Sequence, residues 1–262
     1  MVDLGPILSD LAAEGQSLDD VVSDVAVDWR IATPAEGWTI AHQIAHLTWT
    51  DAKALIAVRT PDDFGAELKR ALAAGETYVH DGALEIAEKP RAELLAEWRA
   101  GRADLAAALA EAPPGTKFPW YGPPMSAASM ATARLMETWA HAQDVYDALG
   151  LEREPTDRIR HIARFGVRTR DFAFSVNSLA PPTEEFRVEL RAPSGELWAY
   201  GPEDAAQRVT GSALDFCLVV TQRRHPDDTH LVAEGPEAAE WLGIAQAFAG
   251  PPGQGRKAGQ FE

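Results

Sequence analysis

The chain has 262 residues, with 24 Lys and Arg side chains against 40 Asp and Glu, and therefore a formal net charge of −16. Nucleic acids and anionic membranes bind proteins through cationic patches, so this balance argues against both as main partners. A chain of this length with 46% hydrophobic residues is typical of one large or two modest globular domains. We expect a small-molecule substrate and a monomer or small homo-oligomer.

The sequence favours a reducing, cytoplasmic environment. The first fifteen residues, MVDLGPILSDLAAEG, have neither a cationic leader nor a continuous apolar segment. No apolar stretch reaches the roughly 18 residues that a membrane-spanning helix needs. The single cysteine, Cys217, cannot form an internal disulfide, and its neighbours Phe216 and Leu218 predict a buried thiol with a raised pKa.

Helices are expected in the first part of the chain. Hydrophobic periodicity and turn signals predict helices over about residues 3–27, 38–58, 62–73, 89–111, 126–149 and 155–175. Ser126 and Gly150 are the expected cap residues of the fifth helix. Long helices in this arrangement predict a four-helix bundle over residues 1–150, followed by a connecting helix and linker over 151–180.

The pattern changes after Pro181. Short strands are predicted at residues 186–190, 197–200, 208–210 and 230–233, with helices at about 212–224 and 236–248 between and after them. This mixture predicts a small α+β domain over residues 181–250, and the tail 251–262 is expected to be disordered. The predicted fold class is therefore a two-domain α+β protein.

Two pairs of polar residues in the helical part have the spacing of metal ligands. His42 with His46, and Glu137 with His141, are each four residues apart, which places both members of a pair on one helical face. Histidine and glutamate bind zinc-like divalent ions, and a catalytic site takes three such ligands and leaves a position open. A solvated helix face is the alternative, because each pair points away from the apolar stripe of its helix.

Two segments carry a resemblance to a known family. Residues 33–47 read TPAEGWTIAHQIAHL, and residues 133–145 read ARLMETWAHAQDV. The first resembles the tryptophan-then-histidine-leucine signature of DinB-like bundles, specifically the metal-binding domain of mycothiol-dependent maleylpyruvate isomerases. The second resembles that family's Glu-x-x-x-His helix. The resemblance implies a divalent metal, zinc first with nickel or iron as alternatives, held by His46, Glu137 and His141.

The second part of the chain resembles the same family. Residues 209–224 and 231–235 are similar to the C-terminal domain of these isomerases, whose fold is like that of the sterol carrier proteins. The resemblance implies a sterol-carrier-like domain in which Arg223 is the functional arginine that binds a carboxylate of substrate or cofactor. The chain is most similar to an actinobacterial branch of metal-binding proteins.

Four further residues are candidates for the site. His42 is a fourth ligand, a hydrogen-bond partner of a ligand, or a neutral group that lines the pocket. Asp144, one turn beyond His141, is either a carboxylate partner of a ligand imidazole or a surface acid. Trp120 and Tyr121 either wall a pocket for a small molecule or cofactor, or pin their loop to the bundle.

The resemblance implies a mycothiol-dependent transferase or isomerase that acts on a small electrophilic acid. One glutamate and two neutral histidines leave a divalent ion with a charge of about +1, which favours hydroxide or thiolate in the open position. A buried Cys217 cannot supply the thiol, so mycothiol would come from outside. Three other functions stay open: a metal-dependent hydrolase that uses metal-bound water, a non-catalytic metal- or lipid-binding protein, and a stress-linked bundle that acts through partners.

Overall fold

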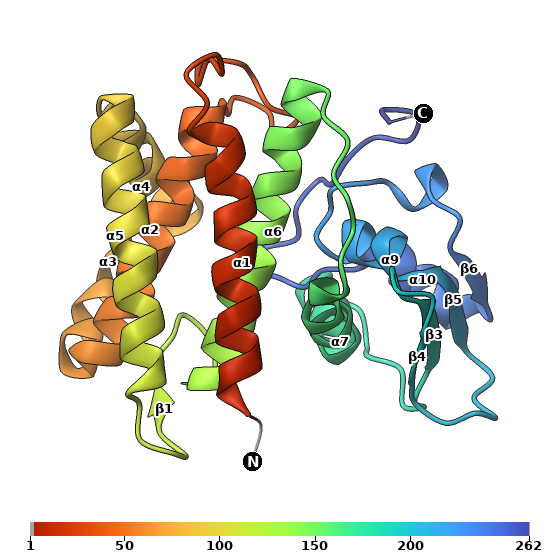
Figure 1. The fold of residues 1–262 in the computed structure, drawn as a ribbon. Helices are drawn as coiled ribbons and strands as arrows, with labels where there is room; N and C mark the ends of the chain where they lie inside the picture. The colour runs from red at the N-terminus through yellow and green to blue at the C-terminus, as the bar shows by residue number, and fades with distance from the viewer. Residues whose placement is uncertain (1–2, 262) are drawn as a thin grey trace. The chain divides into compact units, whose positions relative to one another are not determined.

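The chain forms a series of helices followed by a mixed sheet with helices (Figure 1). The computed structural model describes residues 3–261, without the side chain of Glu76. These residues fall into two compact units, Met1–Arg153 and Glu154–Glu262. The ends of the predicted bundle and tail, residues 1–2 and 262, lie outside the described residues. No helix in the described part is both long and apolar enough to cross a bilayer.

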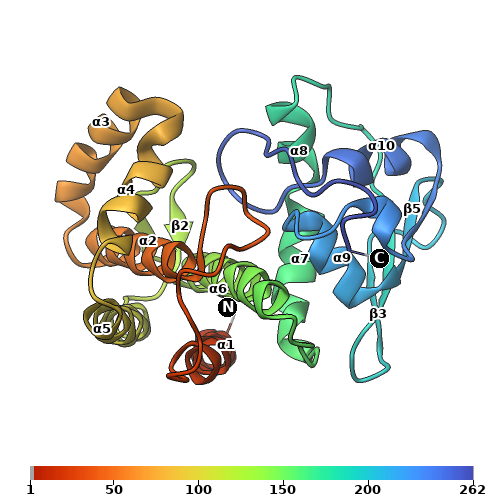
Figure 2. The same cartoon turned by 90° about the horizontal axis from the view of Figure 1, so that it is seen from above.

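Six α-helices build the described part of unit 1. They are α1 (Leu4–Val22), α2 (Ile40–Arg59), α3 (Phe64–Ala74), α4 (Tyr78–Ala87), α5 (Arg91–Ala110) and α6 (Ala127–Leu149). Helix α2 packs against α4, α5 and α6, while α1 packs against α5 and α6. Figure 2 shows α1 and α5 nearly end-on. The long helices α1, α2, α5 and α6 therefore form the predicted bundle, and α3 and α4 are added beside α2.

Local sequence explains where these helices begin and end. Ser126 Oγ accepts a hydrogen bond from Ser129 N (3.2 Å), and Gly150 ends α6 in the left-handed conformation (φ 62°). Both predicted caps of α6 are thus confirmed. Helix α1 ends at Val22 rather than near residue 27. There the Trp29 indole Nε1 donates a hydrogen bond to Val22 O, the last carbonyl of the helix (2.9 Å).

The sequence did not predict two features of unit 1. Helix α4 was missed, and so was a short antiparallel pair, β1 (Lys117–Phe118) with β2 (Met125–Ser126). Two-residue strands are too short to show an alternating pattern. The pair brings the two ends of the 117–126 loop together directly before α6.

Two clusters of buried side chains form the core of unit 1. Representative members are Leu18, Ile44 and Trp98 in the first cluster, and Phe64, Leu105 and Met130 in the second. All six are at most 1% exposed. Each such side chain contributes about 1.5–3 kcal/mol to the hydrophobic driving force for folding.

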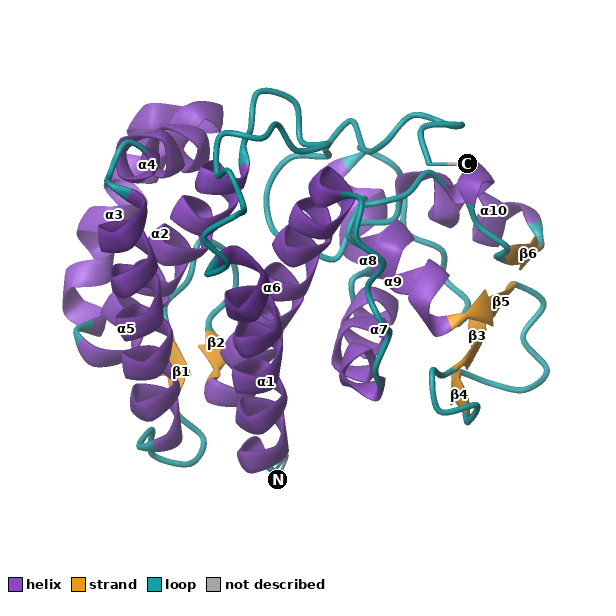
Figure 3. Ribbon diagram, turned by 45° about the horizontal axis from the view of Figure 1, so that its top comes forward, coloured by secondary structure: helices purple, strands orange, loops and turns teal. Residues whose placement is uncertain are grey.

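Unit 2 combines a four-stranded sheet with helices. Its elements are α7 (Arg160–Arg168), α8 (Arg170–Val176), β3 (Arg187–Arg191), β4 (Leu197–Tyr200), β5 (Arg208–Ser212), α9 (Ala213–Val220), β6 (Val232–Glu234) and α10 (Pro236–Ile244). The strand order is β4-β3-β5-β6, with β3 and β5 parallel and the other two pairs antiparallel. Figure 3 shows these strands in orange. The predicted α+β domain is present.

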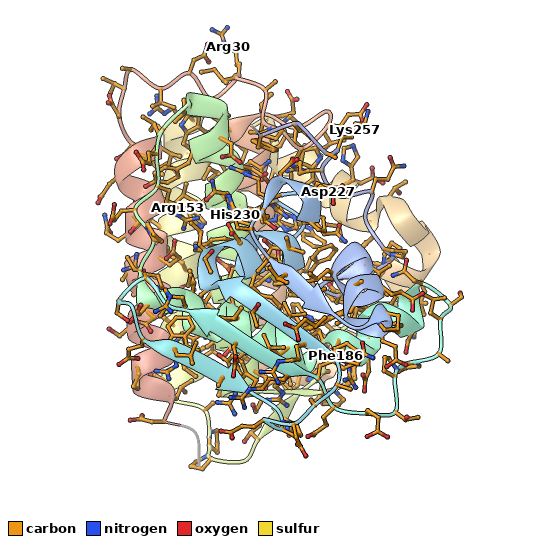
Figure 4. All side chains as sticks on the ribbon, turned by 90° about the vertical axis from the view of Figure 1, so that its right-hand side faces the viewer. Arg30, Arg153, Phe186, Asp227, His230 and Lys257 are labelled. Carbon is orange, nitrogen blue, oxygen red and sulfur yellow. The ribbon has the colours of Figure 1, made fainter. Side chains whose placement is uncertain are left out.

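The core of unit 2 lies between its sheet and helices. Val188 and Val209 are fully buried at neighbouring positions of the parallel pair β3–β5. The Trp241 ring of α10 packs edge-on against Phe186, which is labelled beside the sheet in Figure 4, and against Phe216 of α9. The centroid distances are 5.7 and 5.8 Å. The sheet therefore packs its apolar face on aromatic rings of the helices.

Unit 2 departs from the predicted boundaries in its first helix, in its tail, and at α9 and α10, which end at Val220 and Ile244 rather than near residues 224 and 248. The single helix predicted at 155–175 is split into α7 and α8 at Thr169, whose Oγ1 donates hydrogen bonds to carbonyls of the preceding turn. Residues 251–261, the described part of the tail, have no helix or strand. Nevertheless Gly259 N donates to Asp228 Oδ1 (2.6 Å), and the Arg224 guanidinium lies 3.8 Å from the centroid of the Phe261 ring. The tail thus has defined contacts where the sequence predicted disorder.

Candidate metal centre

Helices α2 and α6 bring the three predicted ligands together. One ligand atom from each of His46, Glu137 and His141 lies within 4.8 Å of the others. His46 Nε2 and His141 Nε2 are each 3.3 Å from Glu137 Oε2. The predicted convergence of these side chains is confirmed. Two neutral imidazoles and one carboxylate are a donor set that a divalent ion accepts.

His42 has a role that the sequence did not predict. Its Nδ1 accepts a hydrogen bond from Thr39 N (3.2 Å) and lies 2.8 Å from Thr39 Oγ1, so that His42 and Thr39 form a capping box at the start of α2. His42 is not among the three clustered ligands. Burial and the nearby charge of His80 lower the pKa of His42, which favours the neutral ring.

Gln43 holds His141 in one orientation. His141 Nδ1 lies 2.5 Å from Gln43 Oε1, while Gln43 Nε2 donates to Thr33 Oγ1 (2.8 Å). Thr33 Oγ1 in turn donates to the carbonyl of Trp38 (3.0 Å), so it must accept from Gln43. This chain of donors fixes the Gln43 amide with its oxygen toward His141. His141 Nδ1 therefore carries the proton of the neutral ring.

The orientation of His141 favours a cation between this residue and Glu137. A neutral ring protonated at Nδ1 has a lone pair on Nε2, and this nitrogen faces Glu137 Oε2 at 3.3 Å. Two acceptors at this distance repel each other unless a metal ion lies between them or, in its absence, a second proton on Nε2 makes the hydrogen bond to Glu137. In addition, His46 Nδ1 is buried and has no hydrogen-bond partner among the described residues. The residues present therefore fit a divalent ion.

Glu137 is kept ionised at the centre of the cluster. Burial acts to raise the pKa of Glu137, but hydrogen bonds with His141 and His46 and the charge of Arg134 outweigh it, and the pKa lies well below its usual range. Arg134 is 3% exposed, and its Nε donates to Asp51 Oδ1 (3.1 Å). The carboxylate is consequently in the form that binds metal throughout the physiological pH range.

Trp38 covers one side of the cluster. Its ring is stacked on His141, with centroids 6.0 Å apart and an interplanar angle of 22°, and lies 5.4 Å from the ring of His46. Its indole Nε1 donates to Nδ1 of His80 on α4 (3.1 Å). The tryptophan of the sequence signature is thus a wall of the site, and α4 helps to hold it.

Comparison with known proteins agrees with this geometry. Residues 11–146 match the family described as the mycothiol maleylpyruvate isomerase N-terminal domain. The chain belongs to this family. Residues 182–234 also match the family described as wyosine base formation.

Relatives in this family include two uncharacterized proteins of Mycobacterium tuberculosis, from strains CDC 1551 and H37Rv. Each is 58% identical over 258 residues, which cover 98% of this chain and 100% of the relative. A crystal structure of the mycothiol-dependent maleylpyruvate isomerase matches with a TM-score of 0.58 at 18% identity, covering 90% of this chain and 96% of that one. A histidine-to-alanine mutant of that isomerase matches with the same TM-score at 20% identity. The likeness confirms the predicted two-part α+β fold.

Asp144 is a buried acid of α6. It is 1% exposed, three residues beyond His141 on α6. Its predicted role as partner of a ligand imidazole stays a prediction, and the partner found at His141 Nδ1 is Gln43.

Trp120 and Tyr121 pack against the bundle. Their ring centroids lie 5.7 and 5.1 Å from that of Phe64, and the Tyr121 hydroxyl is 3.2 Å from the hydroxyl of Tyr78 on α4. These contacts pin the loop between β1 and β2 to α3 and α4. They favour the structural alternative, and a role in binding a cofactor stays a prediction.

Arg223 follows the end of α9 in unit 2. Its backbone N–H donates to Leu218 O (2.7 Å), and its Nη1 donates to Thr221 O (2.6 Å). The guanidinium thus interacts with the C-terminal end of its own helix, which a cation stabilises. Cys217, in the same helix, is fully buried, and burial raises its pKa as predicted.

Proposed function

We propose that the protein binds a divalent metal ion, zinc foremost with nickel or iron as alternatives, and acts as a thiol-dependent transferase or isomerase on a small electrophilic acid. The observation that carries the metal site is the pair of acceptors formed by His141 Nε2 and Glu137 Oε2, 3.3 Å apart. The thiol would be mycothiol, which appears in the names of both the family and the solved relative.

His46, Glu137 and His141 would hold the ion. A divalent ion in such a site acts as a Lewis acid and favours the anionic form of a bound water or thiol. Gln43 keeps the ligand nitrogen of His141 facing Glu137, and the low pKa of Glu137 keeps its carboxylate ionised. Trp38 blocks one side, so a substrate would approach from another.

The thiol would have to come from outside the chain. The sequence contains one cysteine, Cys217, which is fully buried in unit 2 with a raised pKa and hence has almost no thiolate at neutral pH. Arg223 is the residue that we propose to bind the carboxylate of the substrate, because a guanidinium binds a carboxylate through two parallel hydrogen bonds.

Metal analysis tests the ligand set. Purified wild-type protein should contain about one divalent ion per chain, and His46→Ala and His141→Ala should lose most of it. His225→Ala is a matched control, because this histidine lies in unit 2 and interacts with Asp227 instead. Wild-type metal content in both ligand variants would refute the site.

Calorimetry with mycothiol tests the thiol. Binding is expected to the metal-loaded protein and not to the metal-stripped protein, because thiolate coordination requires the ion. Equal binding to both forms, or to neither, would exclude a metal-bound thiol and leave metal-dependent hydrolysis or simple metal binding.

Substitution of Arg223 tests its proposed role in binding the carboxylate. For Arg223→Lys we expect lower turnover with unchanged metal content, because lysine lacks the planar guanidinium that makes two parallel hydrogen bonds. Arg224→Lys should keep wild-type turnover.

A further inference from the structure

Unit 1 contains a cavity whose lining includes none of the three metal ligands. Its volume is about 200 Å³, and it is lined by residues of α1, α2, α5 and α6. Leu11, Trp98 and Leu105 are among its apolar lining residues, and Asp51, Arg102 and Thr138 are among its polar ones. Trp98 and Leu105 are each 1% exposed, so the walls belong to the rigid core.

The size of the cavity limits its ligand. An engineered apolar cavity of about 150 Å³ holds one benzene molecule. The present cavity therefore has room for a single ring or a similar branched body with one small substituent. A lipid chain or a nucleotide would not fit.

The polar groups of the cavity call for a ligand that donates a hydrogen bond. Asp51 is 4% exposed; Arg134 donates to its Oδ1 (3.1 Å), and no described residue donates a hydrogen bond to its Oδ2. Thr138 Oγ1 uses its proton on the carbonyl of Arg134 (2.9 Å). Both side chains consequently offer acceptors to the cavity, and a buried acceptor without a donor is costly.

The charges around the cavity favour a neutral ligand. The charge of Asp51 is already balanced by Arg134. Arg102 packs over the Trp98 ring, 4.6 Å from its centroid, and pairs with Asp19 (2.5 Å). A ligand cation would thus face the guanidinium of Arg102, and a ligand anion would face the carboxylate of Asp51.

We propose that this cavity binds a small neutral molecule with an apolar ring and one hydroxyl group, of the size and class of phenol. The hydroxyl donates a hydrogen bond to Asp51 Oδ2, and the ring packs against Leu11, Trp98 and Leu105. This site does not depend on the proposed function of the metal centre.

Calorimetry on the full-length protein, with phenol as the probe, tests the site. Toluene has nearly the same shape and lacks the hydroxyl, so it should bind about tenfold more weakly or worse. Protonated benzylamine, which carries a charge, should not bind detectably. Absence of phenol binding, or toluene binding as tight as that of phenol, would overturn the proposal without any variant protein.

A pair of neighbouring alanines locates the binding. Ala106 lines the cavity, whereas Ala107 is exposed on the same helix. Ala106→Leu should fill the cavity and abolish phenol binding, and Ala107→Leu should keep wild-type affinity. Wild-type phenol affinity in Ala106→Leu would show that phenol binds elsewhere and would overturn the assignment.

Discussion

Gln43 decides which nitrogen of His141 faces the other ligands. The carboxamide is fully buried and is fixed from both sides, by Thr33 on one and by His141 on the other. A ligand imidazole that is held in this way loses little conformational freedom when it binds metal. Partners of this type typically contribute a factor of about 10–100 to metal affinity.

We predict that Gln43→Leu weakens metal binding by about 10- to 100-fold while the ligand set stays complete. Leucine has a similar volume but cannot accept the proton of His141 Nδ1. Competition with a chromophoric chelator measures the affinity. Gln143→Leu is the control, because Gln143 lies on α6 and bonds Asp147. Unchanged affinity in Gln43→Leu would show that the hydrogen bond does not position the ligand.

The sequence predicted the ligands but not their support. Glu137 and His141 share one helix, so their spacing alone places them on one face, and the family resemblance adds His46. Gln43 is an amide and not a metal ligand, and its partner Thr33 is ten residues away in a loop. That contact exists only once the loop folds back on α2, which residue spacing does not reveal.

Glu67 is a second acid whose pKa is set by its neighbours. It is 4% exposed, and it accepts hydrogen bonds from Lys53 Nζ (2.6 Å), the Tyr78 hydroxyl (2.7 Å) and Arg70. Burial acts to raise the pKa of Glu67, but the hydrogen bonds from Lys53 and Tyr78 outweigh it and lower the pKa. Glu67 thereby connects α2, α3 and α4.

We predict that Glu67→Gln lowers the free energy of unfolding by about 2 kcal/mol at pH 7. Because the folded-state pKa is lowered, the carboxylate stabilises the fold fully above the unfolded-state pKa, near 4.5, and this contribution is lost as the pH falls through the folded-state value. Urea unfolding at pH 7, 5 and 3 should therefore show a difference that shrinks at the lowest pH. Glu97→Gln, in an exposed pair with Lys89, should change little at any pH.

At the scale of the elements, α4 shows how packing overrides helix propensity. Gly82 lies in the middle of this helix, where glycine costs about 1 kcal/mol relative to alanine. A Cβ atom at Gly82 would lie 2.3 Å from Nε1 of Trp49 on α2. Gly82 weakens the helix signal of this segment, so that α4 was not predicted, and the same residue lets α4 pack closely on α2.

We predict opposite effects of the same substitution at two helical glycines. Gly82→Ala should destabilise the protein by about 1–3 kcal/mol, because the methyl group meets three atoms of the buried Trp49 ring. Gly101→Ala, in the middle of α5 with open space around it, should stabilise by up to about 1 kcal/mol. Urea unfolding measures both. A stabilised Gly82→Ala protein would contradict the close contact between α4 and α2.

Elements with strong local signals were predicted well. The two caps of α6 and the strands β3 and β4 lie within a residue or two of their predicted positions. The end of α1 and the break between α7 and α8 were not predicted. In both places a side chain donates a hydrogen bond to a backbone carbonyl of the helix: Trp29 at the end of α1, and Thr169 at the break.

At the scale of the whole molecule, the boundary of unit 1 differs from the predicted one by three residues. The sequence places the end of the bundle at Gly150, where α6 stops, whereas the compact unit extends to Arg153. Arg153, labelled in Figure 4, donates to the carbonyl of Trp139 (2.8 Å), packs over the Trp139 ring and forms an ion pair with Glu14 of α1.

We predict that residues 1–153 fold alone and bind the metal ion, because both core clusters and all three ligands belong to unit 1. The fragment 1–150 lacks Arg153, so the carboxylate of Glu14, which is only 2% exposed, loses this ion pair. We therefore expect its free energy of unfolding to be lower by about 3 kcal/mol than that of 1–153. Urea unfolding and metal analysis of the two fragments measure the difference. The fragment 1–153 with Arg153→Ala should resemble 1–150, which separates the effect of the ion pair from that of chain length. Equal stability of 1–150 and 1–153 would show that α6 alone completes the bundle and that the three residues after it are only a linker.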